Sequence, residues 1–209
     1  MIIGISGKAG SGKDTAADVL VRDHGFVRIA LADPMKRFAR GLWHFTEAQL
    51  WGPSQQRNAP DPRYRRDDGT FLSPRHALQT LGTEWGRECD PDVWIRYALM
   101  CAERVMSCAI LHYVPDLGLV YGNEKPRPRG VVIPDVRFAN EMKAIRLAGG
   151  QVWRVTRGTS LGGAESRHVS ETGQDSIHDD AFDRLLHNDG PLEALPGLVG
   201  AALLPEAAE

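Results

Sequence analysis

The sequence predicts an α/β fold in which a mostly parallel sheet is covered by helices on both faces. Short hydrophobic runs typical of buried strands alternate with amphipathic helical patterns along the chain, and such alternation favours parallel strands. A glycine-rich loop joins the first of these runs to the first helix. The run Val131-Val132-Ile133 is wholly β-branched, as expected of a central strand.

The elements are expected in a regular order. The predicted strands lie at 1–6, 26–31, 131–133, 151–156 and 182–187. The predicted helices cover 14–24 and about 91–107, and others begin at 33, 73, after 133 and at 191. Gly25 is expected to end the first helix, and Asp33-Pro34 supplies an N-cap and a first-turn proline for the second.

Helical spacing of hydrophobic residues gives several helices an expected buried face. The first is expected to bury Ala17, Leu20 and Val21, the second Phe38, Ala39 and Leu42, and the helix from Ser73 Leu78, Leu81 and Trp85. Three other segments lack any periodicity and are expected to be irregular: 52–72, 112–129 and 158–173. Pro196 falls inside the last predicted helix, which is therefore expected to be kinked or to begin late.

Size and charge exclude several classes of protein. The 209 residues, 42% hydrophobic and 25% charged, suit one domain spanning 1–209. A net charge of −2 provides no drive toward nucleic acid or an anionic membrane, and no apolar run is long enough for a membrane span. Neither a nucleic-acid partner nor a membrane is therefore expected. Cys89, Cys101 and Cys108 form no metal or disulfide pattern, and no signal peptide is evident, which favours the cytoplasm.

The loop after the first strand carries the strongest chemical signal. Gly7-Lys8-Ala9-Gly10-Ser11-Gly12-Lys13 matches the first seven positions of the phosphate-binding loop. Glycines allow successive backbone N–H groups to turn toward a phosphate, and the following helix adds its positive N-terminus. Lys13 supplies a mobile charge that can follow a phosphoryl group during transfer.

Position eight of this motif departs from the usual Ser or Thr. Asp14 stands there and Thr15 follows. The Asp14 carboxylate could hold Mg²⁺ directly or through water, and the Thr15 hydroxyl could reach the α-phosphate. Alternatively, Asp14 only complements the helix dipole.

Six pieces of the chain together carry a family resemblance. They are Gly7–Thr15, Ala32–Lys36, Leu78–Glu84, Asp92–Ile95, Asp135–Glu141 and Asn188–Gly190. With them the chain resembles the deoxynucleoside monophosphate kinase family known from tailed bacteriophages, from residue 2 to about 200. The resemblance implies a three-layer P-loop kinase fold, the reaction ATP + dNMP = ADP + dNDP, a need for Mg²⁺, and a host-cytoplasmic location. An acceptor-binding insertion is expected at about 35–108 and a lid at about 157–175.

The motifs and the resemblance nominate a set of site residues. Catalytic candidates are Lys13, Arg137 and Arg157, and magnesium candidates are Asp14 and Asp135. Nucleotide-binding candidates are Gly10, Ser11, Gly12, Lys13, Asp14, Thr15, Arg154 and Asn188. Acceptor-binding candidates are Asp33, Lys36, Arg40 and Arg87. Arg167 is expected on the lid, and His168 matches a family position without a derivable role.

Structural alternatives stay open for several of these residues. Asp33 could serve only as an N-cap, and Lys36 and Arg40 could lie on a solvated helix face. Asp135 follows a central strand, where parallel sheets bind ligands, but it could also form a helix-start ion pair.

Other functions are also open. One is a different small-molecule kinase, such as one resembling dephospho-coenzyme A kinase, and another is a non-catalytic nucleotide switch. The guanine signature Asn-Lys-x-Asp of GTPases is absent. The sequence leaves open the accepted bases, the exclusion of ribonucleotides and the formation of a homodimer.

Overall fold

The computed structural model describes residues 1–158 and 177–204, and the chain divides into two compact units. The first unit comprises Met1–Leu31, Ile95–Tyr113 and Leu119–Glu209. The second comprises Ala32–Trp94 and the short stretch Val114–Gly118. Much of the predicted acceptor-binding insertion, about 35–108, falls in the second unit.

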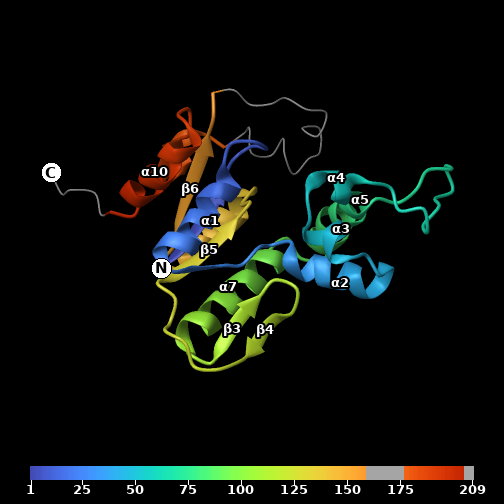
Figure 1. Cartoon of the computed structure of the whole chain (residues 1–209), viewed down its shortest axis with the longest axis horizontal. Helices are drawn as coiled ribbons and strands as arrows, with labels where there is room; N and C mark the ends of the chain where they lie inside the picture. Colours follow the sequence, from blue (N-terminus) through green and yellow to red (C-terminus); the bar gives the residue numbers. More distant parts are fainter. Residues whose placement is uncertain (159–176, 205–209) are drawn as a thin grey trace. The chain divides into compact units, whose positions relative to one another are not determined.

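A five-stranded sheet forms the centre of the first unit (Figure 1). Its strands are β1 (Ile2–Ser6), β2 (Phe26–Arg28), β5 (Gly130–Pro134), β6 (Gln151–Thr156) and β7 (Arg184–His187). Their order is β2-β5-β1-β6-β7, and every neighbouring pair is parallel. The predicted α/β fold with a parallel sheet is therefore confirmed.

Helices cover the two faces of this sheet because side chains alternate along each strand. Ile3 and Ile5 pack in one core with Leu20 of α1 (Lys13–His24) and Val199 of α10 (Leu195–Ala202). At Gly4 the sheet faces the other way: a Cβ there would lie 2.6 Å from Ile145 Cδ1 of α8 (Ala139–Leu147). The sheet thus lies between α1 and α10 on one side and α8 on the other.

Local signals set most ends of these elements. Helix α1 ends at Gly25 as predicted, with φ 70°. Pro196 stands in the first turn of α10, which begins at Leu195 after a 3₁₀ turn, Leu192–Ala194; the late start is confirmed. Strand β2 is shorter than the predicted 26–31, and as an edge strand it is paired with β5 alone.

The predicted irregular insertion at 112–129 is wrong in its first half. β3 (Leu111–Val114) and β4 (Gly118–Tyr121) form a separate two-stranded sheet. It follows α7 (Val93–Ser107), which buries Ile95, Ala98, Cys101, Ala102 and Val105. Along β3, Leu111 and Tyr113 are buried and the two residues between and after them are less so, an alternation typical of a strand with one buried face.

The second unit is a group of short helices. They are α2 (Asp33–Trp43), α3 (Glu47–Trp51), α4 (Ser54–Asn58), α5 (Pro74–Gln79), the π-helical segment Thr80–Gly86 and α6 (Arg87–Cys89). Ala39, Phe45, Leu50 and Ala77 form its core, with Trp43, Trp51 and Tyr64 packed against them. This unit therefore has a hydrophobic core of its own.

The region 52–72 is more ordered than predicted. It contains α4 and a bridge between Arg65 and Phe71, and it is organised around the buried carboxylate of Asp61. Arg63 donates to Asp61 from Nε at 2.9 Å and from a terminal nitrogen at 2.7 Å, and Gln49 Nε2 donates at 2.9 Å. These bonds hold the pKa of Asp61 well below its usual range, although burial opposes the shift.

Several predicted buried positions are wrong. Val21 is exposed on α1, and Phe38 and Leu42 are more than half exposed on α2, where Ala39 is buried as predicted and Met35 is buried as well. Trp85, expected in a core, is 58% exposed. Helical spacing gives the faces of a helix but not which face its neighbours cover.

Candidate active site

The site residues of the first unit follow the carboxyl ends of adjacent strands. The register pairs Ile5 of β1 with Pro134 of β5, and Ser6 of β1 with Arg154 of β6. Thr156 of β6 is paired with His187 of β7. The phosphate loop, Asp135, Arg157 and Asn188 therefore leave the same edge of the sheet from four neighbouring strands, as ligand sites of parallel sheets do.

The phosphate loop has the backbone shape that its glycines allow. Gly10 and Gly12 have φ of 79° and 96°, in the left-handed region that other residues avoid. Space around Gly10 is open, whereas a Cβ at Gly12 would overlap the amide nitrogen of Asn188. Ser11 N donates to Lys8 O at 3.1 Å, which closes the loop, and Lys13 then begins α1.

Lys13 lies between two carboxylates. Its Nζ is 3.8 Å from Asp135 Oδ1 and 3.7 Å from Asp14 Oδ2, and its side chain is only 12% exposed. Asp135 has φ 67°, which is unusual for a residue with a Cβ and costs backbone energy. The structure thus brings together Lys13, Asp14 and Asp135, the predicted phosphate ligand and the two predicted magnesium ligands.

Asp14 has a further partner that the sequence did not indicate. Arg28 of β2 donates to Asp14 Oδ1 at 2.7 Å and, from its other terminal nitrogen, to Asp18 Oδ1 at 2.8 Å. Both carboxylates are more than half exposed. Arg28 lies fourteen residues from Asp14, and only the pairing of β2 in the sheet makes their contact predictable.

Arg137 is fixed by the turn that starts α8. It donates to Asp135 Oδ2 at 2.7 Å, while Glu141 Oε2 accepts from the backbone N–H of Arg137 at 2.8 Å and of Phe138 at 3.1 Å. Glu141 is buried, so these N–H donors satisfy a carboxylate that would otherwise be costly. Glu141 is the last residue of the Asp-Val-Arg-Phe-x-Asn-Glu block, and that position could have indicated it. It was not among the site residues predicted from the sequence.

Asn188 connects the loop to the end of β7. Its Nδ2 donates to Ser11 O at 2.9 Å, and its backbone O accepts from Arg157 Nε at 2.9 Å. The side chain is buried, and its Oδ1 has no hydrogen-bond partner among the described residues. Asn188 therefore supports the loop backbone and fixes Arg157 at the same time.

Arg154, a predicted nucleotide-binding residue, lies in β6 and contacts residues that precede β7. It donates to Ile177 O at 2.7 Å and Asp179 Oδ1 at 2.9 Å, and its guanidinium lies 4.9 Å from the centre of the Phe182 ring. These contacts hold the chain that leads into β7. The lid predicted at about 157–175, with Arg167 and His168, lies almost entirely outside the described residues.

All four predicted acceptor residues belong to the second unit, and three of them lie together on α2. Asp33 is buried at the start of α2, as its first residue rather than its N-cap, which is Ala32. Lys36 and Arg40 lie on α2 with it and contact one indole ring, that of Trp51. The fourth, Arg87, is half-buried in α6.

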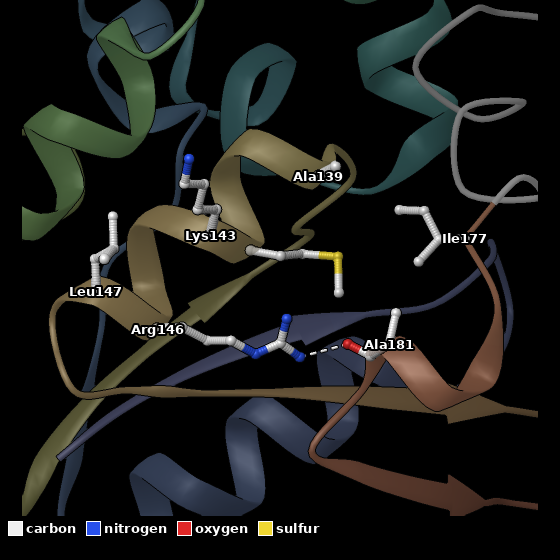
Figure 2. Close-up of a pocket in the computed structure, with 7 residues that line it drawn as sticks. Ala139, Lys143, Arg146, Leu147, Ile177 and Ala181 are labelled. Atoms are coloured by element: carbon white, nitrogen blue, oxygen red, sulfur yellow. Dashed lines mark hydrogen bonds between the residues drawn. The ribbon is translucent and has the colours of Figure 1, made fainter.

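A separate pocket of about 360 Å³ lies beside α8 (Figure 2). Figure 2 shows Lys143, Arg146 and Leu147 of α8 on one side and Ile177 and Ala181 on the other. None of the predicted site residues lines this pocket.

No cluster of three or more His, Cys, Asp or Glu side chains able to hold a metal occurs in the described part of the chain. None of the helices described there is long and apolar enough to span a membrane.

Comparison with known proteins identifies one relative over most of the chain. It is named "Putative deoxynucleotide monophosphate kinase", comes from Acanthamoeba polyphaga mimivirus, and is 29% identical over 193 residues. The alignment covers 92% of this chain and 91% of the relative. No protein-family model matches the chain.

Two solved structures are similar in outline. Shikimate kinase from Aquifex aeolicus has a TM-score of 0.48 and 11% identity, with 97% of this chain and 96% of that chain covered. TT1252 from Thermus thermophilus has a TM-score of 0.44 and 19% identity, with 98% of each chain covered. Because both scores are below 0.5, the fold assignment rests on the strand order and register given above.

The resemblance to the deoxynucleoside monophosphate kinase family, indicated by the motifs, is confirmed by the mimivirus relative over nearly the whole chain.

Proposed function

We propose that the protein transfers the γ-phosphate of ATP to a deoxynucleoside 5′-monophosphate, forming ADP and a deoxynucleoside diphosphate. The observation that carries this proposal is the convergence of the phosphate loop, Lys13, Asp135 and Arg157 on one edge of the parallel sheet. The name of the mimivirus relative supports a deoxynucleotide as the acceptor.

The donor nucleotide suits the phosphate loop. The space around Gly10 is open, and Gly10 and Gly12 have the left-handed backbone that allows N–H groups of such a loop to turn toward phosphate oxygens. Lys13 carries its charge from the first residue of α1, where the helix N-terminus also favours anions. Thr15 follows in the same turn, half-buried and within the motif.

The carboxylates fit a magnesium–nucleotide complex. Asp14 and Asp135 both lie within 4 Å of Lys13 Nζ, and each carboxylate also pairs with an arginine, Asp14 with Arg28 and Asp135 with Arg137. Magnesium is commonly held by one or two carboxylates together with phosphates and water, so no larger protein cluster is needed. When bound, Mg²⁺ supplies neutralisation of the phosphate charge. Asp14 would first have to share or release Arg28.

The reaction needs little acid–base chemistry from the protein. The acceptor oxygen of a monophosphate is already anionic, so catalysis consists of alignment and charge stabilisation. Lys13 and Arg137 supply positive charge, and Glu141 and Asp135 fix the position of Arg137. Arg157 follows the end of β6, and its Nε donates to the backbone O of Asn188, which holds the guanidinium in place.

The acceptor is expected in the second unit. Lys36 and Arg40 provide two cations on one face of α2, and a monophosphate carries up to two negative charges. Asp33 supplies a buried carboxylate beside them that can accept from a hydroxyl group. These assignments make the second unit the acceptor-binding part of the chain.

The proposal is tested by ADP release with ATP and Mg²⁺. The panel contains the four common deoxynucleoside monophosphates, their ribose counterparts and dephospho-coenzyme A. Turnover of one or more deoxynucleotides well above the ATPase background is expected, with the diphosphate product identified by chromatography. Turnover of dephospho-coenzyme A alone would assign the chain to the other kinase class. ATP binding without turnover of any acceptor would indicate a nucleotide switch.

A further inference from the structure

Trp51, at the end of α3, contacts all three acceptor candidates on α2. Its Nε1 donates to Asp33 Oδ1 at 3.4 Å. Lys36 Nζ lies 5.4 Å and Arg40 Cζ 5.6 Å from the centre of its ring. Residues 33, 36 and 40 lie three and four positions apart, so they share one face of α2.

The ring lowers the electrostatic cost of placing the two cations together. Lys36 and Arg40 are one helical turn apart, where like charges repel. A cation within about 6 Å of an indole centre is attracted by the negative face of the ring. The Trp51 ring therefore stabilises both positive charges and leaves them as charges. A carboxylate in its place would neutralise one of them.

Arg40 is held from a second side. It donates to the backbone O of Asp116 at 2.5 Å and lies 3.5 Å from Asp116 Oδ2. Its guanidinium is thus confined between the turn of the β3–β4 hairpin and the Trp51 ring. This restriction reduces the entropy that the side chain would lose on binding a phosphate.

The remainder of Trp51 is anchored in the hydrophobic core of the second unit. The side chain is half-buried and packs against the cluster of Ala39, Phe45, Leu50 and Ala77. The same residue thus has an apolar part fixed by packing and a polar edge and face directed to α2. A leucine could fill the core but could supply neither the N–H donor nor the ring face.

We propose that Trp51 is a positioning residue for the acceptor: it orients Lys36 and Arg40 to bind the phosphate of the monophosphate and holds the Asp33 carboxylate beside them. This inference rests on the proposed function. It adds a residue that acts through the binding groups rather than by touching the reacting atoms.

The test compares Trp51→Leu and Trp51→Phe with Trp43→Leu. Trp43 is a matched control because it is also a half-buried tryptophan of the same cluster, stacked on Phe45 at 5.8 Å between ring centres. For each variant, kcat and the KM values for ATP and for the acceptor are measured, together with Tm. Trp51→Leu is expected to raise the acceptor KM about tenfold and leave the ATP KM within about twofold. Trp51→Phe, which keeps a ring face, is expected to recover part of that loss.

Two outcomes would overturn the inference. One is an acceptor KM in Trp51→Leu within about twofold of the wild type. The other is an equal rise in Trp43→Leu, which would show that Trp51 acts only through packing. In the supporting outcome, Trp43→Leu lowers Tm but leaves the acceptor KM unchanged.

A binding measurement separates this inference from the proposed function. Inorganic phosphate is titrated calorimetrically into the Lys13→Ala variant, in which the phosphate loop is weakened, with and without Trp51→Leu. One result is that the wild type turns over no acceptor while Trp51→Leu weakens phosphate binding severalfold. That result supports the positioning role and contradicts the proposed reaction. If phosphate binding is the same in both proteins, the positioning role is wrong.

Discussion

The proposed phosphate transfer depends most directly on Lys13. Its side chain is nearly buried, its charge is shared between Asp14 and Asp135, and it follows directly after the glycines of the loop. Lys13→Ala is expected to lower kcat by about 10²- to 10³-fold or more, because it removes a charge that stabilises the transferring group. Steady-state ADP release measures the loss.

Lys143→Ala is the matched control for this variant. Lys143 is exposed on α8, lines the pocket of Figure 2, and belongs to the same unit as Lys13. Its removal is expected to leave kcat unchanged, and both variants are expected to keep the wild-type circular dichroism spectrum. Near-normal turnover in Lys13→Ala would exclude the proposed mechanism.

Asp14 and Asp18 offer a second matched pair at the scale of single residues. Both accept a hydrogen bond from Arg28, at 2.7 and 2.8 Å, and both are similarly exposed, but only Asp14 lies beside Lys13. Asp14→Asn is expected to raise the Mg²⁺ concentration needed for half-maximal rate by roughly tenfold. Asp18→Asn should leave it unchanged. A magnesium titration of the two variants decides between a metal role and the helix-dipole role, since equal curves would support the latter.

At the scale of elements, Asp61 determines the order of the segment between α3 and α5. Hydrogen bonds from Arg63 keep the pKa of this carboxyl well below its ordinary value, so the folded state holds it charged. Asp61→Asn is expected to lower the free energy of unfolding at pH 7 by about 1–3 kcal/mol, because it weakens bonds to a buried group. Urea denaturation at pH 7 measures the difference.

The difference in free energy of unfolding between wild type and Asp61→Asn is expected to depend on pH. A carboxyl with a depressed folded-state pKa stabilises the fold fully above its unfolded pKa, about 3.9, and loses that contribution as pH falls toward the folded value. The stability difference between wild type and Asp61→Asn should therefore shrink below about pH 4. Asp67 is an exposed carboxylate of the same segment, so Asp67→Asn serves as the control for the loss of one surface charge. A difference that stays constant down to pH 3 would contradict the assignment.

At the scale of the whole molecule, the two units separate the predicted donor and acceptor functions. The phosphate loop, Asp135 and Asn188 belong to the first unit, whereas Trp51 and the α2 cations belong to the second. Phe45→Leu in the core of the second unit is expected to cost about 1–2 kcal/mol of stability and to raise the acceptor KM. The ATP KM should stay within about twofold.

A conservative change in the other core controls for stability alone. Ile5→Val, fully buried in β1, is expected to cost about 1 kcal/mol without raising the acceptor KM. The two KM values of each variant are compared with its midpoint of thermal unfolding. An equal rise of both KM values in Phe45→Leu would contradict the separation of functions by unit.

Elements with a strong local pattern were predictable from sequence. The strands 1–6 and 151–156 and the helix ending at Gly25 carry their own hydrophobic spacing and stop signals. The hairpin β3–β4 was missed because its strands are short and partly exposed. The buried face of α2 was only partly predicted: Ala39 is buried as expected, but Phe38 and Leu42 share its helical spacing and are exposed, while packing buries Met35.

The phosphate loop could be predicted without any structure, since consecutive residues between a strand and a helix carry the whole motif. Which other groups lie beside that loop depends on how the strands are ordered in the sheet. Asp135, Arg157 and Asn188 are far apart along the chain, and the strand order β5-β1-β6-β7 brings their strand ends to one edge. The contacts of Arg28 with Asp14 and of Trp51 with α2 likewise depend on packing between elements, which a local pattern does not encode.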